Sequence, residues 1–579
     1  MEKGQIVQIK IEDQTEEGRG LGRSNGLAIF VKDAVFGDVV EAKITKVKKR
    51  YAFAQIERIV EPSPYRIENE CPYMNLCGGC TYGNISYEGQ LLIKEKHVRD
   101  RLERIAELEN PKVNEIVGAY NIDRYRNKAT MPIWTGGIIT RKGGIVENLD
   151  SPKIGFYAPK SHDVIDCQDC FLQSVPAMAA ADAVRRFMEE DNITAYDPKW
   201  EKGLMRQMVV KTAFGTGEVM VVLVINGKGI PNGQKLVAML DDAIYNLPPD
   251  ENGMYYSLES VVLNVNKGKS NELFGEENIT LAGKPVIRDE AFGLNFEISP
   301  LAFYQVNPEQ TEKLYAKAIE YADITGEETV LDLYCGVGTI GLCAAAAGAG
   351  RVIGIEAVKG AVLDANRNAV INGIVNARYV CGRAEVELPK LMGKGPDADK
   401  VDADLRIKTA DVVFLDPPRA GCDKALLDAV AEIAPEKIVY VSCDPATMSR
   451  DIKFLTERGY IFEEATPVDM FPHTKHVETV VLLSKGKIDS KKVRVEFSLE
   501  DMDMSGFQKG ATYEQIKAYV LEHSGLKVSS LYISQIKRKC GLEVGQNYNL
   551  SKKEDAKVPQ CPPEKESAIR EALKFYNLI

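Results

Sequence analysis

The 579-residue chain contains no long apolar run. A membrane-spanning helix needs about 18 or more consecutive apolar residues, and no window of the sequence reaches that length. The first residues, MEKGQIVQIKIEDQ, lack the apolar core and the small-residue cleavage site of a secretory signal. We therefore expect a cytoplasmic protein that does not span a membrane.

The chain also contains few cysteines for its length and has no net positive charge. Twelve cysteines in so long a chain are too dilute for a disulfide scaffold, which favours roles as ligands, catalysts or core residues. The net charge of −11 argues against a protein that coats nucleic acid, because phosphate would be repelled. A local basic face remains compatible with the sequence. Residues 43–50, KITKVKKR, would form such a face or, equally, the solvated edge of a strand.

The length predicts three to five structural units. Residues 1–60 contain short alternating runs with glycine turns, which predict a small β-barrel. Residues 61–300 begin with the linker EPSPY and a cysteine-bearing loop, and then mix strand and helix patterns as an α+β middle domain would. Residues 301–485 alternate strands and helices, which predicts a doubly wound α/β domain with a mainly parallel sheet. Residues 486–579 carry three helix candidates.

A glycine-rich turn follows the first strand of the α/β domain. Gly336, Gly338 and Gly341 satisfy G-x-G-x-x-G, and Glu356 lies at the end of the next strand. Such a turn lets backbone approach a ligand, and the acid can accept the ribose hydroxyls of an adenosine cofactor. NAD enzymes share this pattern. Asp416, in DPPR after the strand VVFL, forms a rigid turn at the same edge of the sheet and favours S-adenosylmethionine, with a simple helix cap as its alternative role.

A cysteine, Cys443, stands at the carboxyl end of the strand KIVYVS. The ends of neighbouring parallel strands converge on one crevice, so Cys443, Asp416 and the glycine turn should face each other. A thiol there suits methyl transfer to an unactivated carbon, because thiolate addition at carbon 6 of uracil makes carbon 5 nucleophilic. A buried core cysteine is the alternative interpretation, and it is the one we give to Cys335, Cys343 and Cys381.

The same chemistry requires a base that removes the proton from carbon 5. Glu478 begins the apolar strand ETVVLL, where a carboxylate shielded from solvent would have a raised pKa. His476, two residues earlier, is the alternative base, or a loop histidine that orients its neighbour.

Four motifs in this order, LDLYCGVGT, FLDPPRAG, YVSCDPAT and FPHTKHVETV, resemble the RNA uracil-5-methyltransferase family, which acts on transfer RNA and 23S ribosomal RNA. GRGLGR and GDVVEAKI near the N-terminus resemble the TRAM domain, a small OB-like RNA-binding barrel. The resemblance covers roughly residues 1–485 and implies a Rossmann-like class I methyltransferase domain, with S-adenosyl-L-methionine as the methyl donor.

The resemblance also implies a role for each matching residue. Cys443 would be the nucleophile, although the family often has asparagine where this chain has Asp444. Glu478 would be the general base. The positions implied to bind S-adenosylmethionine are Gln305, Tyr334, Glu356 and Asp416. Phe303 lies two residues before Gln305, so that on a strand the two would share a face and Phe303 would stack on a base; a core phenylalanine is the alternative.

Three cysteines, Cys71, Cys77 and Cys80, lie within ten residues around a pair of glycines, and Cys167 and Cys170 are candidates for a fourth ligand. Zinc held by four thiolates is the generic interpretation. The spacing resembles the four-iron, four-sulfur (4Fe-4S) site of the ribosomal-RNA branch of the family, and matching that pattern selects Cys170. Such a cluster would be structural or would position RNA, since methyl transfer has no redox step.

Our leading hypothesis is therefore a monomeric enzyme that methylates carbon 5 of a uridine in 23S ribosomal RNA. A transfer-RNA uracil-5-methyltransferase is the first alternative, and it is disfavoured because such enzymes commonly lack these cysteines. A noncatalytic RNA-binding assembly protein and an NAD-dependent oxidoreductase are the others. Intact Cys443 and Glu478 argue against a noncatalytic assembly protein. An NAD-dependent oxidoreductase would leave the motifs DPPR, SCDP and HVE unexplained.

Overall fold

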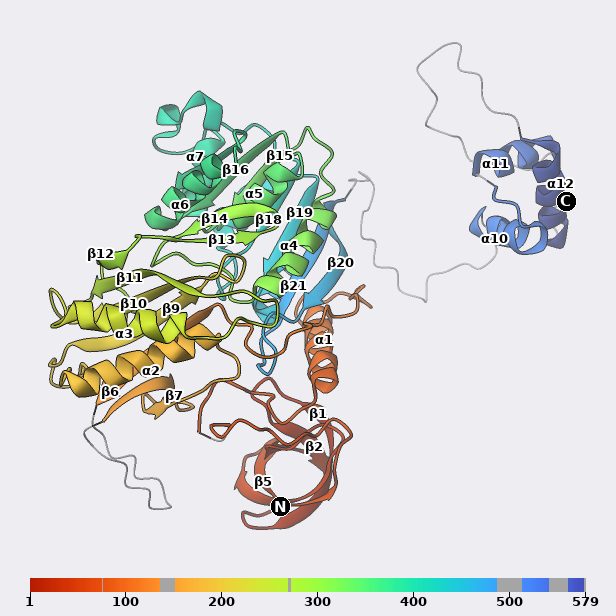
Figure 1. The fold of residues 1–579 in the computed structure, drawn as a ribbon. Coiled ribbons are helices and arrows are strands. Elements are labelled where there is room, and N and C mark those ends of the chain that lie inside the picture. Colours follow the sequence, from red (N-terminus) through yellow and green to blue (C-terminus); the bar gives the residue numbers. More distant parts are fainter. Residues whose placement is uncertain are drawn as a thin grey trace. The chain divides into compact units, whose positions relative to one another are not determined.

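The structure is a computed structural model that describes residues 1–74, 76–135, 151–268, 272–486, 513–528, 530–540 and 561–576. Residues 1–488 form one compact unit and residues 489–579 form a second (Figure 1). Within the described ranges, no helix combines the length and the apolar character needed to cross a membrane.

Five strands close into a barrel at the N-terminus, in the order β1-β2-β3-β5-β4, as the short alternating runs predict (Figure 1). Every second residue points inward, so that Ile9, Ile11, Ile29 and Val31 are buried while residues between them are more accessible. The strands are β1 (Ile6–Gln14), β2 (Gly20–Ser24), β3 (Leu27–Lys32), β4 (Val39–Val47) and β5 (Tyr51–Glu61).

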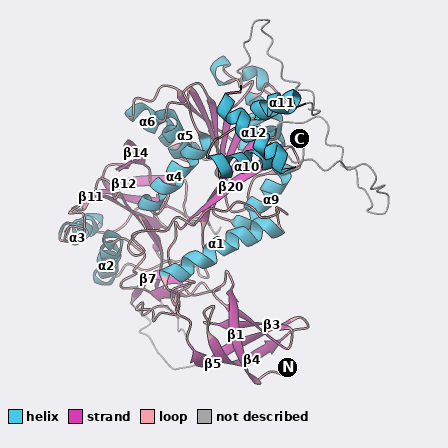
Figure 2. Ribbon diagram, turned by 90° about the vertical axis from the view of Figure 1, so that its right-hand side faces the viewer, coloured by secondary structure: helices cyan, strands magenta, loops and turns pink. Residues whose placement is uncertain are grey.

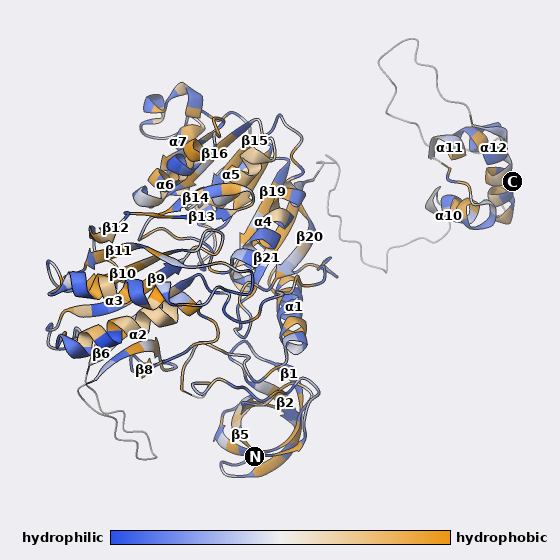
Figure 3. Ribbon diagram, viewed as in Figure 1, coloured by the Kyte–Doolittle hydropathy of each residue, from blue (hydrophilic) through white to orange (hydrophobic). Residues whose placement is uncertain are grey.

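The middle of the chain is built on a seven-stranded sheet in the order β12-β11-β10-β9-β6-β7-β8. Helices α2 and α3 pack on one face, and hydrophobic and hydrophilic residues alternate along both helices because one side of each is buried (Figure 3). The elements are β6 (Lys128–Thr135), β7 (Pro152–Tyr157), β8 (Val164–Asp166), α2 (Val175–Glu190), β9 (Met205–Thr212), β10 (Glu218–Ile225), α3 (Gly233–Tyr245), β11 (Ser257–Val265) and β12 (Glu277–Gly283).

The predicted α/β domain follows the hairpin of β13 (Ile287–Ala291) and β14 (Leu294–Ile298). Its sheet has the order β17-β16-β15-β18-β19-β21-β20. The first five strands pair in parallel, and β21 pairs antiparallel with both of its neighbours, β19 and β20, so that β21 alone runs opposite to the other strands of this sheet. The elements are α4 (Pro308–Ala322), β15 (Thr329–Leu333), α5 (Thr339–Ala346), β16 (Arg351–Glu356), α6 (Lys359–Ile371), β17 (Ala377–Cys381), α7 (Ala384–Leu391), η1 (Ala398–Lys400), η2 (Ala403–Leu405), β18 (Val412–Leu415), α8 (Lys424–Ile433), β19 (Lys437–Ser442), α9 (Pro445–Thr456), β20 (Tyr460–Val468) and β21 (Glu478–Lys485).

Helices cover both faces of this sheet. Residues of α4, α5 and α6 share one hydrophobic core with the β13–β14 hairpin and with one face of the middle sheet. Residues of α7, α8 and α9 form the core on the opposite face. The middle and α/β segments are therefore joined by a continuous apolar core.

Helix α1 (Tyr87–Arg104) connects the barrel to the α/β domain. Val98 and Leu102 are fully buried in the α/β core, and the helix packs on α9 and β20 (Figure 2). On its barrel side, Arg101 forms an ion pair of 2.7 Å with Glu16 in the β1–β2 loop. The helix thus fixes the barrel beside the α/β domain.

The second unit has a helix at each of the three predicted places: α10 (Tyr513–Ser524), α11 (Ser530–Lys539) and α12 (Pro563–Phe575). Ile516, Val520, Ile533, Ile536 and Ile569 are buried in a core of its own.

The cysteines of the α/β domain correct one prediction. Cys335 and Cys343 are buried, as expected, but Cys381 is exposed. Cys381 ends β17, which is the outermost strand of the sheet, so a neighbouring strand, β16, flanks it on one side only.

Candidate active site

The α/β domain has a cavity of about 1010 Å³ at the carboxyl edge of its parallel strands. Leu333 of β15 lies beside Ile355 of β16 and Leu415 of β18, so the residues that follow these strands share one edge. The residues singled out from the sequence that line this cavity include Phe303, Gln305, Tyr334, Glu356, Asp416, Cys443 and Glu478.

The glycine turn brings backbone to the cavity surface. Tyr334, Gly336 and Gly338 all have positive φ, at 67°, 56° and 82°. A Cβ at Gly338 would lie 2.7 Å from the ring of Tyr379, whereas nothing lies within 4 Å of the Cβ position at Gly336. A ligand in the cavity can therefore approach the backbone at Gly336 closely.

The carboxylate of Glu356 is fixed at the rim of the same cavity. It accepts hydrogen bonds from the backbone N–H groups of Gly336, at 3.1 Å, and Val358, at 2.7 Å. This orientation suits an acid that binds ribose hydroxyls, and the open space above Gly336 suits an adenosine cofactor.

Two acidic side chains near the turn are shielded from solvent. Burial raises the pKa of Asp332 to about 7, and burial with the charge of Asp332 raises the pKa of Asp416 to about 7. One oxygen of Asp332 accepts the N–H of Gly341 at 2.8 Å, while the other is buried without a hydrogen-bond partner among the described residues.

Cys443 and Glu478 are brought together by strand register. The antiparallel pairing of β19 with β21 places Ser442 opposite Thr479, so Cys443 and Glu478 are the adjoining residues on the two strands. Cys443 is half-buried in the turn into α9, and Glu478 is 4% exposed.

The electrostatics of this pair are set by burial and by Arg419. Burial raises the pKa of Glu478 to about 8, with Asp416 adding to the rise and Arg419 opposing it. Burial, with the charge of Glu478, raises the pKa of the Cys443 thiol to about 11, and Arg419 again opposes the rise. Arg419 is therefore the cation that favours the anionic form of both groups.

The surroundings of Phe303 differ from the prediction. Residues 301–306 form a loop and not a strand, so the argument that Phe303 and Gln305 share a strand face is wrong. Phe303 is 59% exposed, which also excludes a core role, yet both side chains reach the cavity. The loop turns because Pro300 and Pro308 bracket it and α4 begins at Pro308.

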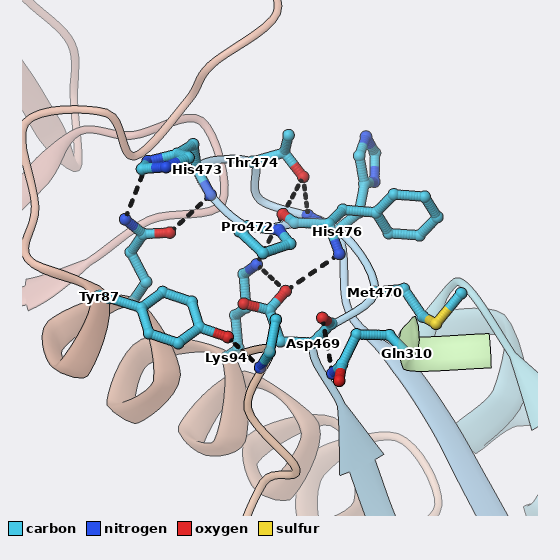
Figure 4. Close-up of polar contacts among 12 residues, drawn as sticks. Tyr87, Lys94, Gln310, Asp469, Met470, Pro472, His473, Thr474 and His476 are labelled. Carbon is cyan, nitrogen blue, oxygen red and sulfur yellow. Dashed lines mark hydrogen bonds and ion pairs between the residues drawn. The ribbon is translucent and has the colours of Figure 1, made fainter. Parts of the chain in front are cut away.

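The loop before β21 is held by buried polar contacts (Figure 4). The Lys94 ammonium of α1 lies 2.6 Å from an Asp469 oxygen and donates to the carbonyl of Phe471 at 3.0 Å, with both charged side chains fully buried. The backbone N–H of His473 donates to Gln90 at 2.7 Å. These contacts anchor the segment that leads to Glu478.

The cysteine loop encloses a separate cavity of about 360 Å³. Its lining includes the five thiols of Cys71, Cys77, Cys80, Cys167 and Cys170. Across the described residues, no group of three or more Cys, His, Asp or Glu side chains has an arrangement that could hold a metal ion. Burial and the charge of Cys170 both raise the pKa values of the Cys71, Cys77 and Cys80 thiols, so these four thiols lie near one another around the cavity.

The cavity lining also includes charged residues for which the sequence predicted no role, among them Arg126, Asp332 and Arg419. Asp332 could have been identified from the sequence, because a charged residue inside the apolar strand VLDL is unusual. Arg419 stands in the DPPR motif, but its place beside Cys443 depends on how β18 and β19 are paired. Arg126 lies far before the α/β motifs in the sequence, and no sequence pattern links it to them.

A doubly wound sheet with a glycine turn, an acid after the second strand and an acid–proline turn at the same edge defines a Rossmann-like class I methyltransferase. Two family models match the chain: tRNA (Uracil-5-)-methyltransferase over residues 281–486 and the TRAM domain over residues 1–56. The barrel and the methyltransferase fold expected from the sequence are thereby confirmed.

This chain matches related proteins over almost their whole length. An uncharacterized RNA methyltransferase of Bacillus cereus (strain ATCC 10987 / NRS 248) is 40% identical over 485 residues, which is 84% of this chain and 98% of that protein. One of Caldanaerobacter subterraneus subsp. tengcongensis is 41% identical over 483 residues, or 83% and 98%. The chain belongs to the RNA uracil-5-methyltransferase family.

A solved structure supports the same assignment. The Pyrococcus abyssi tRNA (uracil-54, C5)-methyltransferase in complex with S-adenosyl-L-homocysteine has a TM-score of 0.60 and 28% identity, covering 82% of this chain and all of that one. The protein is an S-adenosylmethionine-dependent RNA methyltransferase. The alternatives of an NAD-dependent oxidoreductase and of a noncatalytic assembly protein are therefore wrong.

Proposed function

We propose that the protein methylates carbon 5 of a uridine in 23S ribosomal RNA, with Cys443 as nucleophile and Glu478 as base. The observation that carries this proposal is the register of β19 and β21, which sets these two residues side by side in the cavity that the glycine turn also lines. Gln305, Tyr334, Glu356 and Asp416 line the remaining walls and would hold the cofactor.

Each group then has a defined task. The bound cofactor supplies the methyl group on a sulfonium centre. The Cys443 sulfur adds to carbon 6 of the uracil, which makes carbon 5 electron-rich, and Arg419 favours the thiolate that this addition requires. After methyl transfer, ionised Glu478 takes the proton from carbon 5, and the Cys443 sulfur leaves carbon 6.

Trapping with 5-fluorouridine tests the nucleophile. Once methylated, the fluorinated carbon 5 has no proton to lose, so the Cys443–carbon 6 bond cannot be released. Wild-type enzyme with S-adenosylmethionine should form a protein–RNA adduct that survives denaturing electrophoresis. Cys443→Ala should form none and should lose turnover by several orders of magnitude. Substantial turnover by Cys443→Ala would overturn the mechanism.

Glu478→Gln tests the base on ordinary uridine RNA. This variant keeps Cys443 and the cofactor site, so addition and methylation proceed while elimination stalls. A covalent adduct that already carries the transferred methyl group should accumulate, detectable by mass spectrometry. If no adduct accumulates, the base is His476 or a water molecule instead.

The cysteine loop supports ribosomal RNA as the substrate, because its spacing resembles that of the ribosomal-RNA branch. The Pyrococcus abyssi relative, which acts on transfer RNA, favours transfer RNA as the second candidate. Mass-spectrometric mapping of 5-methyluridine in both RNA classes from a deletion strain separates them. Loss of 5-methyluridine from transfer RNA alone would contradict the ribosomal assignment.

We also propose that Cys71, Cys77, Cys80 and Cys170 bind a four-iron, four-sulfur cluster. All four thiols line one cavity, and a cluster suits such a set because each of the four sulfurs binds a different iron. Cys167 also lines the cavity, but its thiol already donates to the carbonyl of Asp169 at 3.2 Å.

Anaerobically purified protein should therefore be brown and contain iron and sulfide in equal amounts. Alanine at any of Cys71, Cys77, Cys80 or Cys170 should lower the iron content, whereas Cys167→Ala, the matched control, should do so less. Stoichiometric zinc without iron would refute the cluster, and an equal loss at Cys167 would mean that Cys170 is not the selected ligand.

A further inference from the structure

A second, smaller cavity of about 120 Å³ borders Cys443 on the side of α1 and the barrel. Cys443 and Arg419 line both this cavity and the large one, so they form part of the wall between the two. The remaining lining comes from the start of α9, from the loop before β21, from His97 of α1 and from Glu16 of the barrel. Its volume is room for several waters.

The charges around this small cavity favour an anion. Arg419 and Lys475 supply two cations, and neither forms an ion pair with a carboxylate among the described residues. Each of the two acids is already engaged: Glu16 accepts from Arg101 at 2.7 Å, and Asp444 accepts the N–H groups of Ala446 and Thr447 at 3.0 Å.

The two histidines of the cavity add hydrogen-bonding groups without adding charge. Burial, with the charges of Arg419 and Lys475, lowers the pKa of His476 to about 4, and burial lowers the pKa of His97. His476 Nε2 lies 3.4 Å from the Arg419 guanidinium. A neutral imidazole can donate the N–H of its ring to an anion.

We propose that the small cavity binds a phosphate group that flanks the target uridine, while the uracil occupies the large cavity against Cys443. A base and its phosphate are separated by one sugar, and the two cavities are separated by Cys443 and its neighbours. This inference rests on the proposed function, since it takes RNA that presents a uridine to Cys443 as the substrate. The phosphate contact would fix the nucleotide's register without reading its sequence.

The test compares charged and neutral RNA backbones. Penta-uridylate is prepared with phosphodiester or with neutral methylphosphonate linkages, and its affinity is measured at equilibrium with S-adenosylhomocysteine present. Lys475→Gln should weaken binding of the phosphodiester oligomer about tenfold, as expected for one charge-assisted contact. On the methylphosphonate oligomer, wild type and Lys475→Gln should bind equally.

Salt dependence gives a second readout. For the phosphodiester oligomer, the slope of log affinity against log salt should fall by about 0.7 in Lys475→Gln, the value for one phosphate contact on a single strand. Lys453→Gln is the matched control, because it removes the same charge from the last turn of α9, outside the cavity lining, and should leave affinity and slope unchanged.

Ala446→Leu fills the cavity without removing charge. It should weaken binding of the phosphodiester oligomer to the same extent as Lys475→Gln. The proposal is overturned if Lys475→Gln weakens both oligomers equally, if it leaves the salt slope unchanged, or if wild type binds both oligomers with the same affinity. A failure of the proposed function is distinguishable, since it would leave these binding differences intact while no 5-methyluridine is formed.

Discussion

The active site concentrates carboxyl groups that are unfavourable to bury. Asp332, Asp416 and Glu478 all have a raised pKa because burial disfavours their charged forms. Such groups reduce the stability of the folded state at neutral pH, and their retention at one cavity is typical of a catalytic site. Glu478 is both a buried carboxyl group that lowers the stability of the folded state and the proposed general base.

Glu478→Gln should therefore stabilise the protein in a pH-dependent way. The pKa of Glu478 rises from the ordinary 4.5 to about 8 on folding. The folded state holds this proton more tightly, so the free energy of unfolding of the wild type falls as pH rises from about 4.5 to 8. Each pKa unit corresponds to roughly 1.4 kcal/mol, which predicts a difference on the order of a few kcal/mol.

The measurement is the melting temperature of both proteins between pH 5 and 9. The advantage of Glu478→Gln over wild type should be small near pH 5 and greatest above pH 8. Lys424→Gln, at an exposed position on α8, should show no such trend. A constant difference across the range would mean that Glu478 is not shifted.

At the scale of elements, the strands that hold the motifs are predictable because each is a short, uninterrupted apolar run. β20, YIFEEATPV, escapes prediction because its two glutamates and its proline interrupt that pattern. Helices α4, α7 and α9 are also absent from the prediction, since α4 and α9 start at prolines that are typical of turns and α7 contains Pro389. The residue types of the site follow from its motifs, but the position of Glu478 beside Cys443 depends on β21 inserting antiparallel between β19 and β20.

The loop between β20 and β21 depends on a contact that no local pattern reveals. Lys94 and Asp469 lie 375 residues apart, yet their side chains are 2.6 Å apart and fully buried. Lys94→Met leaves the Asp469 carboxylate buried and unpaired, which should cost about 3–5 kcal/mol of stability. The double variant Lys94→Met/Asp469→Leu should recover part of that loss, because no lone charge remains.

Urea unfolding of these variants measures the effect. Lys96→Met is the matched control on the same helix: its ion pairs with Asp13 and Asp100 are exposed to solvent, so its cost should be at most about 1 kcal/mol. The anchoring role of Lys94 is contradicted if the two single variants unfold at the same urea concentration.

At the scale of the whole molecule, the barrel and α1 are part of the catalytic unit. The barrel reaches the small cavity through Glu16, and α1 contributes His97 to the same lining and Lys94 to the loop that precedes Glu478. We propose a division into residues 1–60, 61–300, 301–485 and 486–579. The first three segments share cores and contacts within one compact unit, whereas the last has its own.

Truncation after residue 486 should therefore leave the methyltransferase intact. The family match ends at residue 486, and the curated relatives cover about 485 residues of this chain. Residues 1–486 should bind S-adenosylmethionine, measured by calorimetry, within about twofold of the full-length affinity, because the cavity lies wholly within residues 126–478. As a control, Ile569→Asp in the full chain disrupts the core of the second unit and should likewise leave cofactor affinity unchanged. Loss of cofactor binding in the truncated protein would show that the C-terminal unit belongs to the catalytic fold.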